Sequence, residues 1–547
     1  MNIKRARQEI INTIRAYLAK DEDGEYRIPS IRQRPVLLMG PPGIGKTQIM
    51  EQIAGECDLA LVAYTITHHT RQSAIGLPFI VQKEYGGVER SVTEYTMSEI
   101  IASVYDRMEA SGKREGILFI DEINCVSETL APTMLQFLQG KTFGNQAVPK
   151  GWIIVAAGNP QEYNRSVREF DVVTLDRVKV IQVEPDFAVW KEYAYQAGIH
   201  PGIISYLDLR RDQFYRMETT VDGKNFVTAR GWQDLSELIY AYERMGLTVD
   251  REVAVQYLQY PAVAKDFANY LELFTRYRSD YQIEEILSGT IRPGILNRLK
   301  FAPFDERAQV VSLVLAGLSE TFRQARETDR CTQELYTLLM SYREAAAETK
   351  TGGEMSPAET DGAGTDAAET DRAETVAAIP DRAWMDGTKA VRQPAIRLQA
   401  LADQKREAEE NRVRAGQNDR ARIRSARKVL ETLDLWVREL QLSGAEEEAA
   451  WAYLKERFGE KEEERVQTLE KAQERLEYAF DFMEAAYGES QEMVLFITEL
   501  SVNPDSAWYL RENDCPRYFM YNKSLLFEGR DAGIRKELDA IRDLQIT

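Results

Sequence analysis

Short apolar runs alternate with helical patterns between residues 30 and 184. The runs lie at Val36–Met39, Leu59–Ile66, Ile117–Ile120, Ile153–Ala157 and Val178–Val183. Each run has the length of a strand, and uninterrupted apolar runs of this kind are typical of strands that are buried on both faces. The pattern therefore predicts an α/β region in which helices sandwich a parallel sheet.

The pattern changes after this region. From Asp186 to Arg343 helical periodicity dominates and strand signals are few, which predicts a helical lid followed by a helical extension. Residues Glu344–Ala378 contain no Leu, Ile or aromatic residue, and the unit Ala-Glu-Thr-Asp occurs at 358–361 and again at 368–371. Because such a segment cannot bury enough apolar surface to offset its ordering entropy, its composition favours a flexible acidic linker over a regulated docking segment.

Two stretches beyond the linker carry apolar residues at alternating spacings of three and four. The first contains Leu430, Leu433, Val437 and Leu440, and the second contains Val466, Leu469, Leu476, Phe480 and Met483, with polar Gln473 on the same seam. Ser443-Gly444 is a plausible break between them. The spacing predicts an antiparallel helix pair whose apolar seam is packed in a small helical domain, rather than a partner-binding helix.

The sequence thus divides into four predicted regions. They are an α/β core with an N-terminal helix at 1–184, a helical lid and extension at 185–343, a disordered acidic linker at 344–395, and an α-helical, coiled-coil-like domain at 396–547.

Composition limits the functions that this chain serves. Its 547 residues include 69 Lys and Arg against 88 Asp and Glu, a formal net charge of −19. This acidity argues against a nucleic-acid coat or a membrane-surface protein, both of which need basic patches, although a locally basic groove stays open. Around 405–428 basic residues outnumber acidic ones. We interpret this stretch as a solvated helix face with i,i+4 pairs; contact with an acidic partner or nucleic acid is the alternative.

The four cysteines lie far apart and form no Cys-x-x-Cys pair. They therefore fit a reducing compartment better than a disulfide framework or a zinc cluster. The N-terminus lacks the apolar stretch of a signal peptide, and no run of 18 apolar residues occurs in the chain. We expect a soluble, cytoplasmic protein.

A phosphate-binding motif follows the first apolar run. Residues 40–47 read Gly-Pro-Pro-Gly-Ile-Gly-Lys-Thr, a full match to G-x-x-x-x-G-K-[ST] between a predicted strand and a predicted helix. Backbone N–H groups of such a loop turn inward around phosphate oxygens, helped by the helix N-terminus. The residues predicted to bind the nucleotide are Gly40, Pro41, Pro42, Gly43, Ile44, Gly45, Lys46 and Thr47. Lys46 would reach the β- and γ-phosphates, and the Thr47 hydroxyl would ligate Mg²⁺.

Polar side chains end two further apolar runs. Asp121 and Glu122 follow Gly116–Ile120, and carboxylates at the end of a buried strand need a partner because they are costly to desolvate. With the phosphate loop, Asp121 is predicted to hold Mg²⁺ and Glu122 to orient and deprotonate the attacking water. Taken alone, the pair fits a helix N-cap equally well. Asn159, in Gly-Asn-Pro after Ile153–Ala157, would hold the lytic water and touch the γ-phosphate; in isolation it is a turn residue.

The segments GPPGIGKT, ILFIDEIN, IIVAAGNP and TLDRV, in this order, resemble the AAA+ ATPases. The Asp-Glu-Ile-Asn and Gly-Asn-Pro forms look most like the MoxR-like branch, and the resemblance covers about residues 30–245. It implies a five-stranded parallel P-loop NTPase sheet with a small helical lid, here followed by a mostly α-helical C-terminal region. It also implies a ring, most often a hexamer, with ATP between neighbouring subunits.

Two arginines acquire roles from this resemblance. Arg177, in Leu175-Asp176-Arg177, matches the arginine finger that reaches the γ-phosphate of the next subunit, and Arg165 or Arg168 would share or replace it. Arg230 matches the sensor arginine at the start of a lid helix, which Thr228 would cap.

Other segments are less specific. His68-His69 is a poor metal site and is expected in a surface or pore-facing loop. The turn residues and extended flanks of Lys141–Lys150 predict a β-hairpin, and the resemblance implies that both segments face a central pore.

The favoured function is an ATP-hydrolysing ring that remodels or activates a protein client in a chaperone-like manner. In the MoxR-like branch, the partner is often a von Willebrand factor A-type protein. One alternative is a nucleotide-gated scaffold with little turnover, which the intact Asp121–Glu122 pair argues against. The other is a nucleic-acid translocase or restriction-type motor, driven by ATP or GTP, which the acidity of the chain argues against.

Overall fold

The computed structural model describes residues 1–547 except 69–71, 73, 75, 144–145, 164–169, 221–222, 352–393, 415–419 and 524–547. The chain divides into two compact units. Unit 1 includes Met1–Arg326 and the described residues from Glu470 onward, and unit 2 includes Glu327–Glu410 and Arg420–Leu469. None of the described helices is long and apolar enough to cross a membrane.

A five-stranded parallel sheet forms the centre of the first part of unit 1. Its strands are β1 (Val36–Met39), β2 (Ala60–Thr65), β5 (Gly116–Asp121), β8 (Trp152–Gly158) and β9 (Lys179–Gln182). They are ordered β2-β5-β8-β1-β9, and every neighbouring pair is parallel. The sheet confirms the predicted fold class, and each strand coincides with one of the apolar runs.

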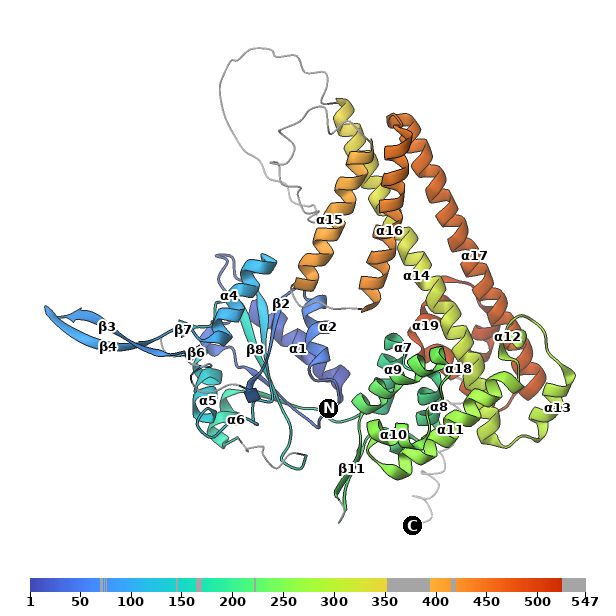
Figure 1. The fold of residues 1–547 in the computed structure, drawn as a ribbon, viewed down its shortest axis with the longest axis horizontal. Helices are drawn as coiled ribbons and strands as arrows, with labels where there is room; N and C mark the ends of the chain where they lie inside the picture. Colours follow the sequence, from blue (N-terminus) through green and yellow to red (C-terminus); the bar gives the residue numbers. More distant parts are fainter. Residues whose placement is uncertain are drawn as a thin grey trace, which may run out of the picture. The chain divides into compact units, whose positions relative to one another are not determined.

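Helices cover both faces of this sheet, which explains why its three central strands, β5, β8 and β1, are almost entirely apolar (Figure 1). On one face, α1 (Ile3–Leu18) and α2 (Gln48–Glu56) pack against residues such as Leu38. On the other face, α4 (Glu99–Ser111) and α5 (Ala131–Gly140) pack against residues such as Leu37. Successive residues of β1 therefore belong to different cores, as the alternation of side chains along a strand requires.

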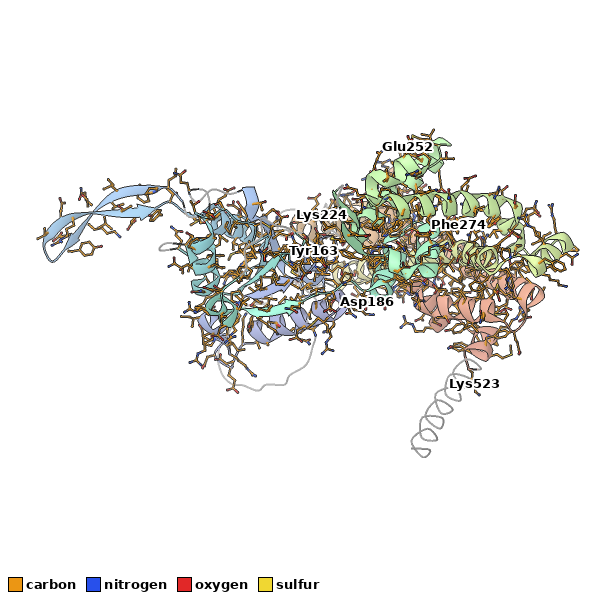
Figure 2. The ribbon with its side chains drawn as sticks, turned by 90° about the horizontal axis from the view of Figure 1, so that it is seen from below. Tyr163, Asp186, Lys224, Glu252, Phe274 and Lys523 are labelled. Carbon is orange, nitrogen blue, oxygen red and sulfur yellow. The ribbon has the colours of Figure 1, made fainter. Side chains whose placement is uncertain are left out.

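Two hairpins extend from the α/β part. The hairpin predicted within Lys141–Lys150 is confirmed by the antiparallel pair β6 (Thr142–Phe143) and β7 (Gln146–Ala147). A longer hairpin, β3 (Pro78–Tyr85) with β4 (Val88–Tyr95), was not predicted. It projects away from the sheet (Figures 1 and 2).

The helical part of unit 1 begins with α7 (Phe187–Ala197), α8 (Pro201–Leu209), α9 (Ala229–Met245), α10 (Arg251–Leu258) and α11 (Pro261–Asp280). Tyr206, Trp232 and Phe267 form its aromatic core, with ring centroids 5.1–5.7 Å apart. The sequence predicted helices with few strands here. The structure adds the antiparallel hairpin β10 (Arg216–Thr220) with β11 (Gly223–Val227), whose strands carry too many polar residues to be recognised as apolar runs.

Further helices of unit 1 are α12 (Ile283–Ile286), α13 (Pro293–Phe301), α18 (Gln491–Val502) and α19 (Pro504–Glu512). A buried ionic cluster joins α18 to α7 and α8. Lys191 Nζ contacts Asp208 at 2.6 Å and Glu499 at 2.5 Å, and Tyr195 Oη donates to Glu499 at 2.6 Å. Burial raises the pKa of Asp208 to about 6, although the charge of Lys191 opposes the increase. The cluster thus holds two carboxylates against one ammonium group.

The predicted linker at 344–395 needs correction at its start. Helix α14 (Phe304–Thr351) continues through 344–351, where Ala and Glu are strong helix formers. Helix α15 (Pro394–Arg414) begins at the other end. The part of the linker at 352–393 lies outside the described residues.

Unit 2 is built from the second part of α14, α15, α16 (Arg420–Ser443) and the first part of α17 (Glu447–Tyr487). Helices α16 and α17 are antiparallel, with the predicted break at Ser443-Gly444 between them (Figure 1). Leu433, Val437 and Leu440 are buried as predicted. Val466 is 41% exposed, so it does not belong to the packed seam. The domain predicted at 396–547 spans parts of both units.

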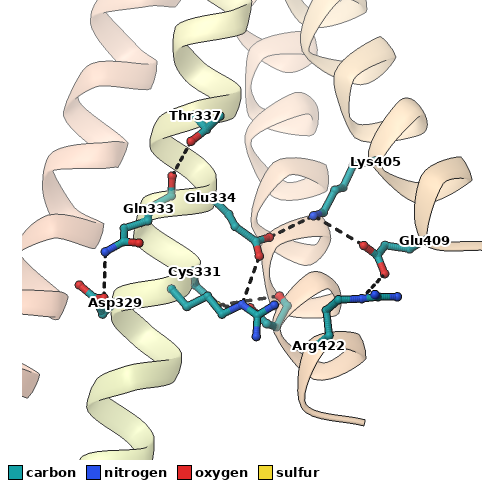
Figure 3. Close-up of polar contacts among 10 residues, drawn as sticks. Asp329, Cys331, Gln333, Glu334, Thr337, Lys405, Glu409 and Arg422 are labelled. Carbon is teal, nitrogen blue, oxygen red and sulfur yellow. Dashed lines mark hydrogen bonds and ion pairs between the residues drawn. The ribbon is translucent and has the colours of Figure 1, made fainter. Parts of the chain in front are cut away.

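Described basic residues of this stretch in unit 2 contact acidic partners (Figure 3). Lys405 Nζ lies 3.1 Å from Glu334 on α14 and 3.8 Å from Glu409, and Arg422 Nε lies 3.3 Å from Glu409. The Lys405–Glu409 pair has the predicted i,i+4 spacing. The contact with Glu334 joins two helices, which spacing along one helix does not predict.

Candidate nucleotide site

The loop at residues 40–47 connects β1 to α2. Gly43 and Gly45 have φ angles of +75° and +90°, in the left-handed region that favours glycine. Gly40 has a different requirement, since a Cβ there would lie 2.7 Å from the carbonyl oxygen of Val183. The glycines therefore allow a tight loop beside the sheet, as a phosphate-binding loop requires.

Lys46 is buried within this loop, with 8% of its surface exposed. Its Nζ donates to the carbonyl oxygens of Gly40 at 2.8 Å and Pro41 at 2.9 Å, and to Asn159 Oδ1 at 2.9 Å. All three acceptors are neutral, so an anionic phosphate would be a stronger partner for this ammonium group.

The charges around Lys46 act in opposite directions on its protonation. Burial lowers the pKa of Lys46 to about 8. The carboxylates of Asp121 and Glu122 oppose this decrease, and the positive charge of Arg230 adds to it. The predicted site residues from three separate segments are thus close enough to influence one another.

Thr47 and Asp121 come together as the metal prediction requires. Thr47 Oγ1 donates to Asp121 Oδ2 at 2.7 Å. A hydroxyl and a carboxylate suit a hard cation such as Mg²⁺, which binds through one or two carboxylates and substrate phosphates rather than in an all-protein cage. The described residues contain no group of three or more His, Cys, Asp or Glu that could hold a metal.

Glu122 occupies an uncommon backbone conformation. Its φ angle is +57°, in the left-handed region. Its N–H donates to Asp121 Oδ1 at 2.9 Å, and its carbonyl oxygen accepts from the Cys125 N–H at 2.8 Å. Such backbone strain persists where surrounding contacts enforce it, often at functional sites.

Asn159 lies at the end of β8, next to β5 in the sheet. Its side chain accepts from Lys46, while Asn124 holds its backbone on both sides. The Asn159 N–H donates to Asn124 Oδ1 at 3.2 Å, and Asn124 Nδ2 donates to the Asn159 carbonyl at 2.8 Å. Sequence reasoning did not single out Asn124, whose only signal was its place in Asp-Glu-Ile-Asn.

The start of α9 contacts the phosphate-binding loop. Thr228 Oγ1 accepts from the Gly231 N–H at 3.2 Å, confirming it as the N-cap of α9. A Cβ on Gly43 would lie 3.0 Å from Thr228 Cβ and 3.5 Å from Arg230 Cβ. Tyr215 Oη also donates to the Pro42 carbonyl at 2.9 Å, a contact that sequence reasoning missed.

Arg177 is separate from these residues. It ends α6 (Val172–Arg177) and its guanidinium donates to Gln139 Oε1 on α5, not to the phosphate-binding loop. Arg165, Arg168 and His69 lie outside the described residues, and His68 ends a short 3-10 helix.

The sheet, with a glycine-rich loop between β1 and α2, has the architecture of a P-loop NTPase. Residues 36–176 match the ATPase family associated with various cellular activities (AAA). This match includes the phosphate-binding loop, Asp121, Glu122 and Asn159, and it supports an ATPase of the AAA+ type. It implies nucleotide binding, for which Mg²⁺ is the typical metal. No curated protein matches the chain.

Proposed function

We propose that this protein hydrolyses ATP with Mg²⁺ at sites between neighbouring copies in a ring, and that the cycle remodels or activates a protein partner. The observation that carries the hydrolytic part is the convergence of Lys46, Thr47, Asp121 and Asn159 through hydrogen bonds of 2.7–2.9 Å. Glu122 follows Asp121 directly and completes this set.

Each residue of the set has a chemical role in phosphoryl transfer. Lys46 and the backbone of residues 40–47 bind the phosphates, and Thr47 and Asp121 hold Mg²⁺, which neutralises charge on the phosphate oxygens when bound. Glu122 orients the attacking water and accepts its proton. Asn159 fixes that water and contacts the γ-phosphate.

The position of Arg177 supports a shared site. Its described hydrogen bond is to Gln139, away from the phosphate-binding loop of its own chain. Four residues before it on α6, and therefore on the same side of the helix, Val173 is 57% exposed. An exposed apolar residue beside a guanidinium fits a surface that docks on another copy, where Arg177 would act as the arginine finger. AAA domains commonly form rings, and we propose a hexamer of the MoxR-like branch.

The hairpin β3–β4 supports contact with a protein client. Ile80 is 74% exposed, and Phe79, Tyr85 and Val88 are also exposed. A two-stranded hairpin with apolar residues in water is marginally stable on its own, so a binding partner would stabilise it. We propose that the client, of von Willebrand factor A type as the resemblance implies, is engaged in a chaperone-like manner.

The test is the steady-state ATPase rate of the full chain with Glu122→Gln as the key variant. Glu122→Gln should retain affinity for a fluorescent ATP analogue and lose turnover, because an amide does not accept the proton. Glu109→Gln, an exposed change on α4, is the matched control and should keep the wild-type rate. Full turnover in Glu122→Gln would overturn the assignment. Nucleotide binding without turnover in the wild type would favour the nucleotide-gated scaffold.

Client binding is tested separately. Glu122→Gln held in ATP should retain a partner through affinity purification, while the same protein in ADP should release it. Equal recovery in both nucleotides would contradict nucleotide-driven remodelling.

A further inference from the structure

Asn124 is buried, and both polar groups of its side-chain amide bind the backbone of Asn159. Only 2% of its surface is exposed, and a buried side-chain amide must find hydrogen-bond partners. Its Oδ1 accepts from the Asn159 N–H at 3.2 Å, and its Nδ2 donates to the Asn159 carbonyl at 2.8 Å. The side chain therefore holds the Asn159 backbone at two points.

The neighbouring glycine makes room for this contact. A Cβ on Gly158 would lie 2.6 Å from Asn124 Oδ1 and 2.9 Å from its Cγ, closer than any side chain permits. Only a side-chain amide of this length offers a donor and an acceptor in one plane. Aspartate lacks the donor, and serine carries a single hydroxyl. Asn124 and Gly158 thus form a matched pair across the ends of β5 and β8.

The contact determines where the Asn159 side chain points. That side chain accepts from Lys46 Nζ at 2.9 Å, so its backbone position sets its place beside the phosphate-binding loop. The turn that carries Glu122 is anchored independently, because the Ile123 N–H donates to the Ala157 carbonyl at 2.9 Å. The side chain of Asn124 therefore positions Asn159 rather than the turn that carries Glu122.

We propose that Asn124 is a positioning residue for hydrolysis, which acts by holding Asn159 in the geometry needed at the γ-phosphate. The inference rests on the proposed ATPase function. A displacement of about 1 Å in a catalytic group can cost about 100-fold in rate. Asn124→Ala should therefore lower kcat by roughly 10- to 100-fold while KM for ATP stays within about threefold, since the phosphate-binding loop is untouched.

The matched control is Asn503→Ala. Asn503 is another buried asparagine of unit 1, which caps α19 and donates to Ser319. Its replacement should lower thermal stability as Asn124→Ala does, but leave kcat within about threefold of the wild type. A similar fall of kcat in both variants would show that Asn124 acts through general stability and would overturn the proposal.

A double mutant separates positioning from independent effects. If Asn124 acts through Asn159, adding Asn124→Ala to Asn159→Ala should cause no further loss of kcat. Losses that multiply would overturn the proposal. Should Asn124→Ala fold poorly, Gly158→Ala replaces it, because its added Cβ displaces the same amide and should give the same fall in kcat.

Hydrogen exchange gives a readout that does not depend on turnover. The Asn159 amide should exchange faster in Asn124→Ala than in the wild type, and unchanged exchange would contradict the two-point contact. Absence of ATPase activity in the wild type would overturn the proposed function itself. Wild-type turnover that Asn124→Ala leaves intact would overturn only the role of Asn124.

Discussion

Replacing Gly43 by alanine should weaken the contact between the phosphate-binding loop and the start of α9. Gly43 has a φ angle of +75°, and an L-residue in this region costs about 1–2 kcal/mol. The new Cβ would also lie 3.0 Å from Thr228 Cβ and 3.1 Å from its Oγ1. Thr228 caps α9 and has little freedom to move, so overpacking adds about 1–3 kcal/mol. The total, about 2–5 kcal/mol, destabilises the packing of the phosphate-binding loop against the start of α9.

Gly45→Ala is the matched control within the same loop. Its φ angle of +90° imposes a comparable backbone cost, but its Cβ would meet only Gln48 Oε1 at 3.6 Å, an ordinary contact. The difference between the two variants therefore isolates the contact with the lid. About 1–3 kcal/mol corresponds to roughly 5- to 150-fold in an equilibrium constant, at about 1.4 kcal/mol per tenfold change.

The assays are urea unfolding and binding of a fluorescent ATP analogue to the full chain. Gly43→Ala should lower the free energy of unfolding, the affinity for the ATP analogue, or both, by more than Gly45→Ala does. The differences in these two free energies should add up to about 1–3 kcal/mol. In a Thr228→Gly background the extra loss should shrink, because the opposing Cβ is gone and glycine is nearly as good an N-cap. Equal losses in the two alanine variants, or no relief from Thr228→Gly, would refute the reasoning.

Three further predictions concern other parts of the chain. Burial raises the pKa of Asp208 to about 6, above its ordinary value of 3.8, so the folded state binds this proton more tightly and gains stability as pH falls through 6. Asp208→Asn should therefore raise Tm at pH 8 and raise it less at pH 5. A difference in Tm that is the same at both pH values would contradict this. Arg177→Ala should keep ATP affinity but lower kcat about 10³-fold or more, whereas an unchanged kcat would remove the arginine-finger role. Glu447→Ala removes the carboxylate that lies 2.6 Å from the guanidinium of buried Arg397 and should cost roughly 1–3 kcal/mol in urea unfolding, while exposed Glu448→Ala should change stability by less than about 0.5 kcal/mol.

The sheet and the phosphate-binding loop were predictable because their signals are local. A strand buried on both faces must be apolar along its whole length, and the glycines and Lys46 of residues 40–47 occur at fixed spacings. The contact of Thr47 with Asp121 followed from the chemistry of Mg²⁺ binding. No knowledge of strand order was needed for these residues.

Features that depend on strand order or on solvent-facing strands were not predictable in the same way. Asn124 contacts Asn159 because β5 lies beside β8 in the sheet. The sequence of neither segment indicates that these two strands are neighbours. The β3–β4 hairpin exposes its apolar residues, so a search for buried runs passes over it. Gly86-Gly87, both with positive φ, is a two-residue turn signal that would have revealed this hairpin.

The ionic cluster of Lys191 has a consequence for biosynthesis. Glu499 follows Lys191 by 308 residues. At synthesis rates of ~5–20 residues per second, roughly 15–60 s pass between the translation of the two residues. During that interval Lys191 has Asp208 but not its second carboxylate, and α7 lacks the contact with α18. The packing of α7 against α18 is therefore completed only after Glu499 has been translated, and the ribosome sets the earliest time at which this helical part reaches its final stability.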